Sequence, residues 1–428
     1  MARVMKDSGI TWLNDIPSAW TVVRNKSCFD CSKEIIGERS SGTQLLSLTT
    51  RGIKEKRPED STGKVPESYD TYQTVAPNDV VMCLFDLDVS AVFSGISPYH
   101  GMISPAYKVL KCKQNILPKY ADYWFSFIFD GRKFKHYAKN LRYTLTYDEF
   151  AVLPIILPSI TEQQRIVTFL DTECARIDAV IEQTRASIEE YKNLKQAVIT
   201  QAVTKGIRPN RPMKDSEIDW VGEIPADWKA FRIANLYDER NESGSDDLPI
   251  LTVSINSGIS DHEVADEDQT RVFVRSEDKT KYKRVYPGDL AYNMMRAWQG
   301  AFGAVRVDGM ISPAYVVAKP KQGVALDSRY VEALLRTPSA IEEMHRYSHG
   351  ITDFRLRLYW PEFKNIRICV PEIDEQCEIA DYIDSQNQRI EDLIAKKERI
   401  VSELLGYRQS LIYEYVTGKK ETNYYDKR

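Results

Sequence analysis

The sequence lacks the features that define several protein classes. It has no run of roughly 18 uncharged apolar residues, which a transmembrane helix needs, and its first 13 residues have no signal-peptide core. We therefore expect a cytoplasmic protein without a membrane partner. Seven cysteines, an odd number scattered over 428 residues, make a disulfide framework improbable. With 20 glycines, 19 prolines and 43% hydrophobic residues, the composition excludes disordered and fibrous chains and fits about three average domains.

An excess of positive charge is also missing. The formal net charge is −4 at pH 7. A protein that binds nucleic acid needs clustered lysine and arginine to neutralise phosphates. Any nucleic-acid interface in this chain must therefore be local.

Motifs for catalysis are absent. There is no phosphate-binding Gly-x4-Gly-Lys-Ser/Thr loop, because the segment Ser61-Thr62-Gly63-Lys64 lacks the upstream glycine and the following hydroxyl. Ser104-Pro-Ala-Tyr107 and Ser312-Pro-Ala-Tyr315 resemble the base-binding loop of amino-methyltransferases. Both lack its second proline, and no Phe-x-Gly-x-Gly methyl-donor loop occurs. We predict a turn at the start of a strand for both segments, and no catalytic residues.

Metal-binding motifs are incomplete as well. Cys28 and Cys31 are not followed by a second Cys or His pair at zinc spacing. His345 and His349 would share a helix face, but Arg346 stands where a metalloprotease has glutamate. We predict no metal site.

What the chain does contain is an internal repeat. The pattern Trp12-x3-Ile-Pro-x2-Trp20 returns 208 residues later as Trp220-x3-Ile-Pro-x2-Trp228, and residues 101–107 recur unchanged as 309–315. This repeat predicts two duplicated globular domains. Each half also ends in a matched segment, 158–204 and 371–417, at an offset of 213.

The two matched segments are each predicted to form one long helix. Thr161 and Asp374 are expected N-caps, Gln164 would complete a capping box, and Gly206 and Gly418 lie at the expected ends. Alternating steps of four and three residues give an apolar seam in each helix, typical of a coiled coil. The alternative is that each stripe docks on its neighbouring domain. The seam residues are Ile166, Leu170, Ile177, Tyr191, Leu194, Val198, Ile379, Ile383, Ile390, Leu393, Leu404 and Leu411.

These patterns predict an α+β fold. It has two duplicated mixed α/β domains separated by two long antiparallel helices that form a coiled coil with pseudo-two-fold symmetry. Strands are expected at residues 80–85 and 315–318, and short helices at 120–129 and 330–335. The predicted order is domain 1 (1–157), central helix (158–206), a proline-containing linker (207–212), domain 2 (213–370), C-terminal helix (371–420) and tail (421–428).

Basic residues alternate with aromatic ones in local segments of both halves. Such segments suit phosphate anchoring combined with contacts to base edges. The alternative is a solvated charged surface. The candidate DNA-binding residues are Arg51, Lys54, Arg57, Arg132, Lys133, Lys135, Arg142, Tyr143, Lys279, Lys281, Arg284, Arg296, Trp298, His349, Arg355 and Arg357.

Together, the motifs resemble the DNA-specificity subunit of type I restriction-modification enzymes over almost the whole chain. The marks are the twin Trp-x3-Ile-Pro-x2-Trp openings, the Gly-x-Ile-Ser-Pro-x-Tyr segments, and the Pro-x3-Glu-Gln-x2-Ile helix entries at Pro158–Ile166 and Pro371–Ile379.

The resemblance implies two target-recognition domains that each read one half of a bipartite site in double-stranded DNA. It also implies that the helices dock two methylation subunits and that restriction subunits join the complex. Those partners would use S-adenosylmethionine, ATP and Mg, with no cofactor in this chain. The alternatives are the equivalent subunit of a system with a fused methyltransferase-nuclease partner, and a self-contained DNA methyltransferase or nuclease.

Overall fold

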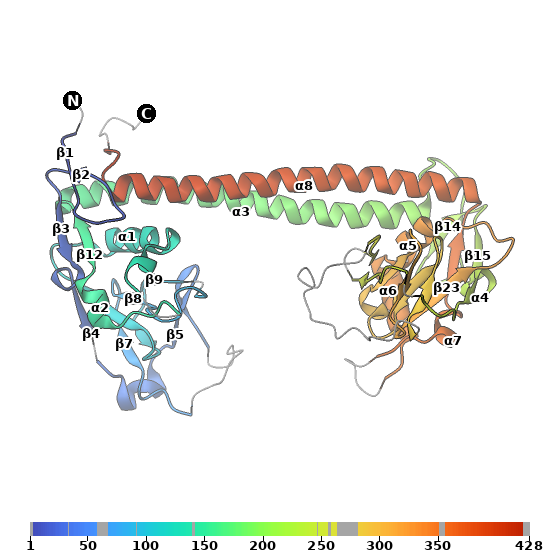
Figure 1. Cartoon of the computed structure of the whole chain (residues 1–428), viewed down its shortest axis with the longest axis horizontal. Coiled ribbons are helices and arrows are strands. Elements are labelled where there is room, and N and C mark those ends of the chain that lie inside the picture. The colour runs from blue at the N-terminus through green and yellow to red at the C-terminus, as the bar shows by residue number, and fades with distance from the viewer. Residues whose placement is uncertain are drawn as a thin grey trace. The chain divides into compact units, whose positions relative to one another are not determined.

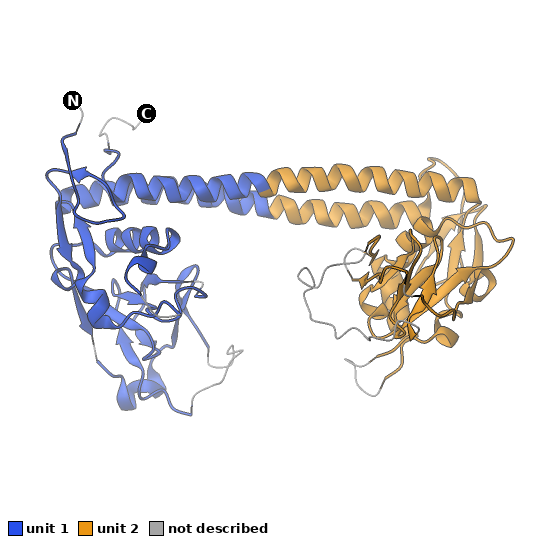
Figure 2. Ribbon diagram, in the orientation of Figure 1, with its two compact units in different colours: residues 1–185, 399–428 blue, residues 186–398 orange. Residues whose placement is uncertain are grey.

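A computed structural model describes residues 3–32, 34–57, 67–90, 92–138, 142–245, 247–255, 258–262, 281–350 and 356–422. The chain divides into two compact units: residues 1–185 with 399–428 form unit 1, and residues 186–398 form unit 2 (Figure 2). Each unit contains one globular domain and one segment of each of two long helices, α3 (Ile160–Lys205) and α8 (Ile373–Val416) (Figure 1).

Unit 1 is built on an antiparallel four-stranded sheet with the order β4-β11-β8-β9. Two-stranded pairs β1-β2, β3-β12, β5-β6 and β7-β10 surround it. The strands are β1 Met5–Lys6, β2 Ile16–Pro17, β3 Thr21–Arg24, β4 Phe29–Ser32, β5 Leu46–Thr49, β6 Gly52–Glu55, β7 Gln73–Val75, β8 Val80–Met82, β9 Ser94–Ile96, β10 Gly101–Ile103, β11 Lys108–Cys112 and β12 Pro154–Leu157. The shorter helices are α1 Pro118–Asp130 and α2 Tyr147–Val152.

Unit 2 repeats this plan around the sheet β16-β23-β20-β21. Its pairs are β13-β14, β15-β24, β17-β18 and β19-β22. The strands are β13 Met213–Asp215, β14 Glu223–Pro225, β15 Lys229–Arg232, β16 Tyr237–Glu239, β17 Val253–Ser254, β18 Gly258–Ile259, β19 Lys283–Val285, β20 Leu290–Asn293, β21 Phe302–Ala304, β22 Gly309–Ile311, β23 Tyr315–Pro320 and β24 Arg367–Val370. The shorter helices are α4 Ile233–Leu236, α5 Ser328–Leu335, α6 Pro338–Arg346 and α7 Trp360–Phe363.

The predicted duplication is confirmed, because every strand pairing of unit 1 has a counterpart in unit 2. The two Ser-Pro-Ala-Tyr segments form the predicted turns: the Tyr107 and Tyr315 N–H groups donate to the carbonyls of Ser104 and Ser312, at 3.2 and 3.0 Å. The turns connect strands of different sheets, β10 to β11 in unit 1 and β22 to β23 in unit 2, so the segment has a structural role in both domains.

Helix α1 shows why the sequence folds this way locally. Pro118 starts the helix, where its missing N–H costs nothing. Tyr120 and Trp124 lie on the buried face, and the helix stops at Gly131. Burial of this aromatic face against the sheet and the long helices forms the core of unit 1.

The ends of the long helices differ in part from the sequence prediction. Gly206 and Gly418 follow the last turns with φ of 74° and 71°, as predicted for left-handed C-terminal residues. The predicted N-caps are wrong, because Thr161 and Asp374 lie inside the first turn. In α3 the Ser159 hydroxyl accepts from the Glu162 N–H at 3.3 Å, so the capping side chain lies two residues earlier than predicted.

The two long helices pair antiparallel within each unit. In unit 1 the Phe169 and Tyr415 rings lie 4.3 Å apart, and in unit 2 the Lys397 ammonium lies 5.6 Å from the Tyr191 ring. The paired segments also join the cores of their own domains. Pairing and docking on the domain therefore occur together rather than as alternatives.

Most of the predicted seam is buried, but its phase is corrected by the structure. Leu194 and Leu393 are 48% and 39% exposed. Buried seam residues are Ile166, Leu170, Ile177, Ile379, Ile383, Ile390 and Leu411, and partly buried ones are Tyr191, Val198 and Leu404. In α3 the buried stripe instead passes through Cys174, Ile181 and Ile188. After Ile177 the stripe steps by four and then three, whereas the prediction stepped by three and then four; both average 3.5 residues per turn.

Within the described residues, no helix is long and apolar enough to cross a membrane.

Candidate nucleic-acid interface

The most strongly repeated motif residues hold the helix ends to the domains. In unit 1 the Trp20 indole donates to the Glu162 carboxylate at 2.7 Å, and Arg3 forms an ion pair with the same carboxylate. Arg3 also lies 4.9 Å from the centre of the Trp20 ring. A Cβ on Gly418 would clash with the Pro17 ring, so only glycine fits where α8 ends against this motif.

Unit 2 repeats the junction in part, because the indole N–H of Trp228, the counterpart of Trp20, has no hydrogen-bond partner among the described residues. Arg211 forms an ion pair with the buried Glu375 and lies 6.0 Å from the Trp228 ring. The Tyr330 hydroxyl lies 3.0 and 3.2 Å from the carbonyls of Cys369 and Val203, which share its one hydrogen, and the Tyr120 hydroxyl lies 3.0 and 3.3 Å from those of Ile156 and Val416. The opening and helix-entry motifs therefore fix each domain to its helix pair, and binding residues must be sought elsewhere.

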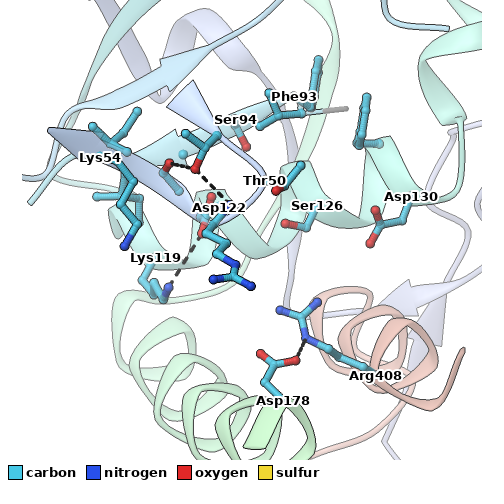
Figure 3. Close-up of a pocket in the computed structure, with 18 of the residues that line it drawn as sticks. Thr50, Lys54, Phe93, Ser94, Lys119, Asp122, Ser126, Asp130, Asp178 and Arg408 are labelled. Carbon is cyan, nitrogen blue, oxygen red and sulfur yellow. Dashed lines mark hydrogen bonds and ion pairs between the residues drawn. The ribbon is translucent and has the colours of Figure 1, made fainter. Parts of the chain in front are cut away.

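A cleft of about 1070 Å³ in unit 1 lies between the β5-β6 hairpin, α1 and the helix pair (Figure 3). The candidate residues Arg51 and Lys54 line its hairpin side. On the opposite side, Arg408 of α8 forms an ion pair with Asp178 of α3 at 3.1 Å. Lys119 lies 3.7 Å from Asp122, whose pKa is raised by burial against the influence of that lysine. The cleft thus carries both signs of charge.

Unit 2 has a cleft of about 800 Å³ at the repeat-equivalent place. Lys195 pairs with Glu391 at 2.5 Å, matching the pair of Arg408 and Asp178. Arg329 pairs with Asp384 at 3.2 Å, matching Lys119 with Asp171 at 3.9 Å. Because the charges in this unit-2 cleft are largely paired internally, we assign it to joining domain and helices rather than to phosphate binding.

The basic loop that follows α1 is paired with two carboxylates. Arg132 and Lys135 both contact Asp88, at 2.6 and 2.9 Å. Arg142 is highly exposed, with a looser contact of 3.7 Å to Asp86. The hydrogen bond and charge of Lys135 lower the pKa of Asp88 below its usual range, and Arg132 lowers it further. The candidate cations of this loop are therefore partly neutralised. Sequence reasoning missed the two aspartates, which lie in the loop after β8.

For the DNA-binding role that the sequence analysis indicates, replacing Asp88 by alanine is expected to strengthen binding to DNA. The change frees two cations, so the dependence of log affinity on log salt should steepen by about one to two units. Salt titrations of affinity check this. Asp15→Ala is the control, because it removes an exposed carboxylate of the same unit that has no side-chain partner among the described residues. An unchanged slope in Asp88→Ala would contradict a role for Arg132 and Lys135 in phosphate binding.

The remaining candidates of unit 1 lie on separate segments. Lys133 stands 5.9 Å from the Trp12 ring, and Lys135 stands 4.7 Å from the Tyr143 ring. Arg51 occupies the exposed tip of the β5-β6 hairpin, and Arg57 is exposed beyond its end. The structure therefore brings Arg132, Lys135, Arg142 and Tyr143 together, with Arg51, Lys54 and Arg57 on the hairpin segment.

In unit 2, Arg296 and Trp298 lie in the loop after β20. The Trp298 indole donates to the Met295 carbonyl at 3.0 Å, and its ring lies 5.6 Å from that of His345. Burial raises the pKa of Tyr315, and the nearby Arg296 guanidinium opposes that rise. This loop thus carries a cation and an aromatic ring beside the start of β23.

A second segment packs against that loop. His349 and Arg357 pair through two backbone hydrogen bonds of 2.9 Å, and the Leu358 N–H donates to the Met294 carbonyl at 2.8 Å. Arg284 and Lys281 lie at β19, where Arg284 is 3.8 Å from Asp308. Lys279 and Arg355 lie outside the described residues. Arg296, Trp298, His349 and Arg357 therefore share one region of unit 2.

The described residues contain no group of three or more His, Cys, Asp or Glu that could hold a metal ion. His345 lies in the last turn of α6, whereas His349 follows the helix and pairs with Arg357, so the two histidines do not share a helix face. Cys28 is buried, and burial raises the pKa of its thiol to about 11, so this thiol is protonated at neutral pH.

The fold and these junctions define a protein with two copies of one domain, each fixed to a pair of long helices and each presenting its own charged loops. No protein-family model matches the chain. Over 271 residues it is 24% identical to the type I restriction enzyme MjaVIII specificity subunit of Methanocaldococcus jannaschii. That alignment spans 59% of this chain and 59% of the relative, less than two thirds of the relative's length.

The fold is similar to that of a solved chain from work on complex assembly and conformational transition of the type I R-M system. The TM-score is 0.65 at 15% identity, over 95% of this chain and 99% of the solved one. The resemblance to type I specificity subunits that the motifs indicated is confirmed by these comparisons.

Proposed function

We propose that this chain is the DNA sequence-recognition and assembly subunit of a type I restriction-modification complex. The observation that carries the proposal is the presence of two complete copies of one domain whose frameworks match and whose loops after β8 and β20 differ. Matched frameworks with different loops suit the reading of two different half-sites in one duplex. The named relative is a specificity subunit, which supports this assignment.

In this function each domain reads one half of a bipartite site in double-stranded DNA. The exposed cations Arg51, Arg57 and Arg142 suit contacts to phosphates, which position a protein on DNA without specifying sequence. The chain itself carries out no chemistry. Two methylation subunits supply S-adenosylmethionine binding and base flipping, and restriction subunits supply ATP- and Mg-dependent cleavage.

The long helices would dock the methylation subunits. Ile400 and Tyr407 of α8 are spaced by one heptad, and both are exposed, at 45% and 52%. The repeat-equivalent positions of α3 include Leu194, whose exposure corrected the predicted seam. An apolar stripe at heptad spacing outside the buried seam suits a helix of another subunit.

Replacing Ile400 by aspartate is expected to weaken association with methylation subunits at least tenfold, because a charge in an apolar helix interface is desolvated without a partner. Sedimentation or light scattering of the mixed subunits measures this. Ser402→Asp, which places the same charge at another exposed position of α8, is the control. Equal association of both variants, with unchanged unfolding curves, would place the docking surface elsewhere.

The proposed function as a whole is tested by labelled methyl transfer to DNA. The purified chain alone is expected to transfer no methyl groups, and the chain mixed with its methylation subunits is expected to methylate adenines at one bipartite site. Sustained turnover by the chain alone would support a self-contained methyltransferase instead. If the chain instead associates with one fused partner that both methylates and cleaves DNA, it is the equivalent subunit of a system with a fused methyltransferase-nuclease.

A further inference from the structure

The loops after β8 and β20 occupy the same structural position in the two domains. In unit 1 the Cys83 N–H closes its loop by donating to the Phe93 carbonyl at 2.8 Å, and in unit 2 the Asn293 N–H donates to the Ala301 carbonyl at 3.1 Å. The N–H groups of Leu145 and Leu358 then tie the next segment to the Leu84 and Met294 carbonyls, at 2.7 and 2.8 Å.

Within this matched frame the charge is reversed. Counted from the start of the loop, where Cys83 and Asn293 are 210 residues apart, Asp86 corresponds to Arg296 and Asp88 to Trp298. The unit-1 loop is two residues longer, because Phe93 and Ala301 at its end are 208 residues apart. The unit-1 carboxylates neutralise neighbouring cations. Residues 294–300 contain no acid, and Arg296 has no ion pair among the described residues. The difference therefore concerns the chemistry that each domain presents, not its framework.

The backbone of Arg296 is held firmly. Its N–H donates to the Asn293 carbonyl at 2.9 Å, and its own carbonyl accepts from the N–H groups of Gln299 and Ala301, at 2.9 and 3.1 Å. The side chain is half-buried beside Tyr315 at the start of β23. Because the backbone is fixed and the side chain is half-buried, the guanidinium can occupy only a small range of positions. Such an arginine suits a ligand atom that is held at one defined position.

We propose that Arg296 is a specificity-determining residue of domain 2 and reads a guanine in one half-site, a proposal that rests on the function proposed above. The planar guanidinium donates two parallel hydrogen bonds to O6 and N7 of guanine in the major groove. A contact to a phosphate needs a less defined geometry, so exposed cations such as Arg51 can make it. Domain 1, with aspartate at the equivalent position, presents no such donor there.

The test uses the complex of the full chain with its methylation subunits. Methylome sequencing first defines the two half-sites, and methylation rates are then measured on duplexes in which each half-site position is varied in turn. Arg296→Ala is expected to lower discrimination for guanine by about 5- to 150-fold at one position of one half-site. The other half-site is expected to stay unchanged, and Arg296→Lys should recover only part of the discrimination.

Arg346→Ala is the matched control, because Arg346 is an exposed arginine of the same unit that pairs with Glu343 on its own helix. A loss of affinity by Arg296→Ala that is uniform over all sequences would identify a phosphate contact and overturn the proposal, as would an unchanged profile. Thermal unfolding of each variant identifies a misfolded protein, and Arg296→Gln then replaces Arg296→Ala. If the unaltered complex methylates no bipartite site, the proposed function fails rather than the role of Arg296.

Discussion

A four-residue insertion at the same level of both long helices is expected to lengthen the spacer of the bipartite DNA site by one or two base pairs. Four residues add about 6 Å to an α-helix, close to two base-pair steps of 3.4 Å. They also add about 400° of rotation, which is 40° more than one turn, so the helix pair absorbs them as a stutter. Both half-site sequences should stay the same, because neither domain is altered.

The ion pairs between the helices give the positions for this insertion. Asp178 with Arg408 in unit 1 and Lys195 with Glu391 in unit 2 define the same antiparallel register. In that register, a duplicate of residues 184–187 after Ser187 lies level with a duplicate of residues 395–398 after Glu398. Methylome sequencing of cells that carry the variant gives the spacer directly.

The control is a four-residue insertion after Pro209, in the exposed segment that follows α3. It leaves both helices intact and should not change the spacer. An active complex with an unchanged spacer, despite longer helices, would show that the helices do not set the distance. Altered half-sites would show that base recognition extends beyond the two domains.

Replacing Gln376 by alanine is expected to destabilise unit 2 by about 3 kcal/mol. Gln376 is 1% exposed; its amide oxygen accepts from the Asp327 N–H, and its amide nitrogen donates to the Pro371 carbonyl, both at 2.9 Å. The substitution leaves a backbone donor and a backbone acceptor without partners, at a cost of about 1–3 kcal/mol each. Denaturant unfolding combined with hydrogen exchange resolved by domain measures the loss.

Because the two domains are duplicated, the equivalent substitution can be made in unit 1. Gln163, which is fully buried, makes the equivalent bonds to Leu117 and Pro158 in unit 1. Gln163→Ala should therefore lower protection in domain 1 and leave domain 2 as it is. Gln388→Ala on the exposed surface of α8 should change stability by less than about 0.5 kcal/mol. Equal effects of all three substitutions would contradict the structural role of the helix-entry motif.

The role of the motif residues bears on how such a protein can diversify. The junction uses Trp20, Glu162 and Gly418 in one unit and their counterparts in the other, and none of them lies in the loops after β8 and β20. Substitutions in those loops can therefore alter the recognised sequence while the attachment of each domain to its helices stays intact.

Several features were determined by the sequence alone, because local chemistry fixes them. Glycine at positions 206 and 418 ends the helices, since the left-handed conformation there is costly for other residues. Pro118 starts α1, and the repeated Ser-Pro-Ala-Tyr segments form turns. The duplication itself is visible as matching letters at fixed offsets.

Other features were decided only by the tertiary structure. Steps of three then four and of four then three residues share one average period, so contacts with α8 and with the core of domain 1 select Ile181 rather than Val180 for burial. Asp88 lies more than forty residues before Arg132, and only the return of the loop after α1 brings their charges together. The difference in charge between Asp86 and Arg296 likewise becomes visible only in the fold, because the two residues lie in loops that follow the equivalent strands β8 and β20. Long-range pairing of this kind depends on where the chain returns in space, which no local pattern records.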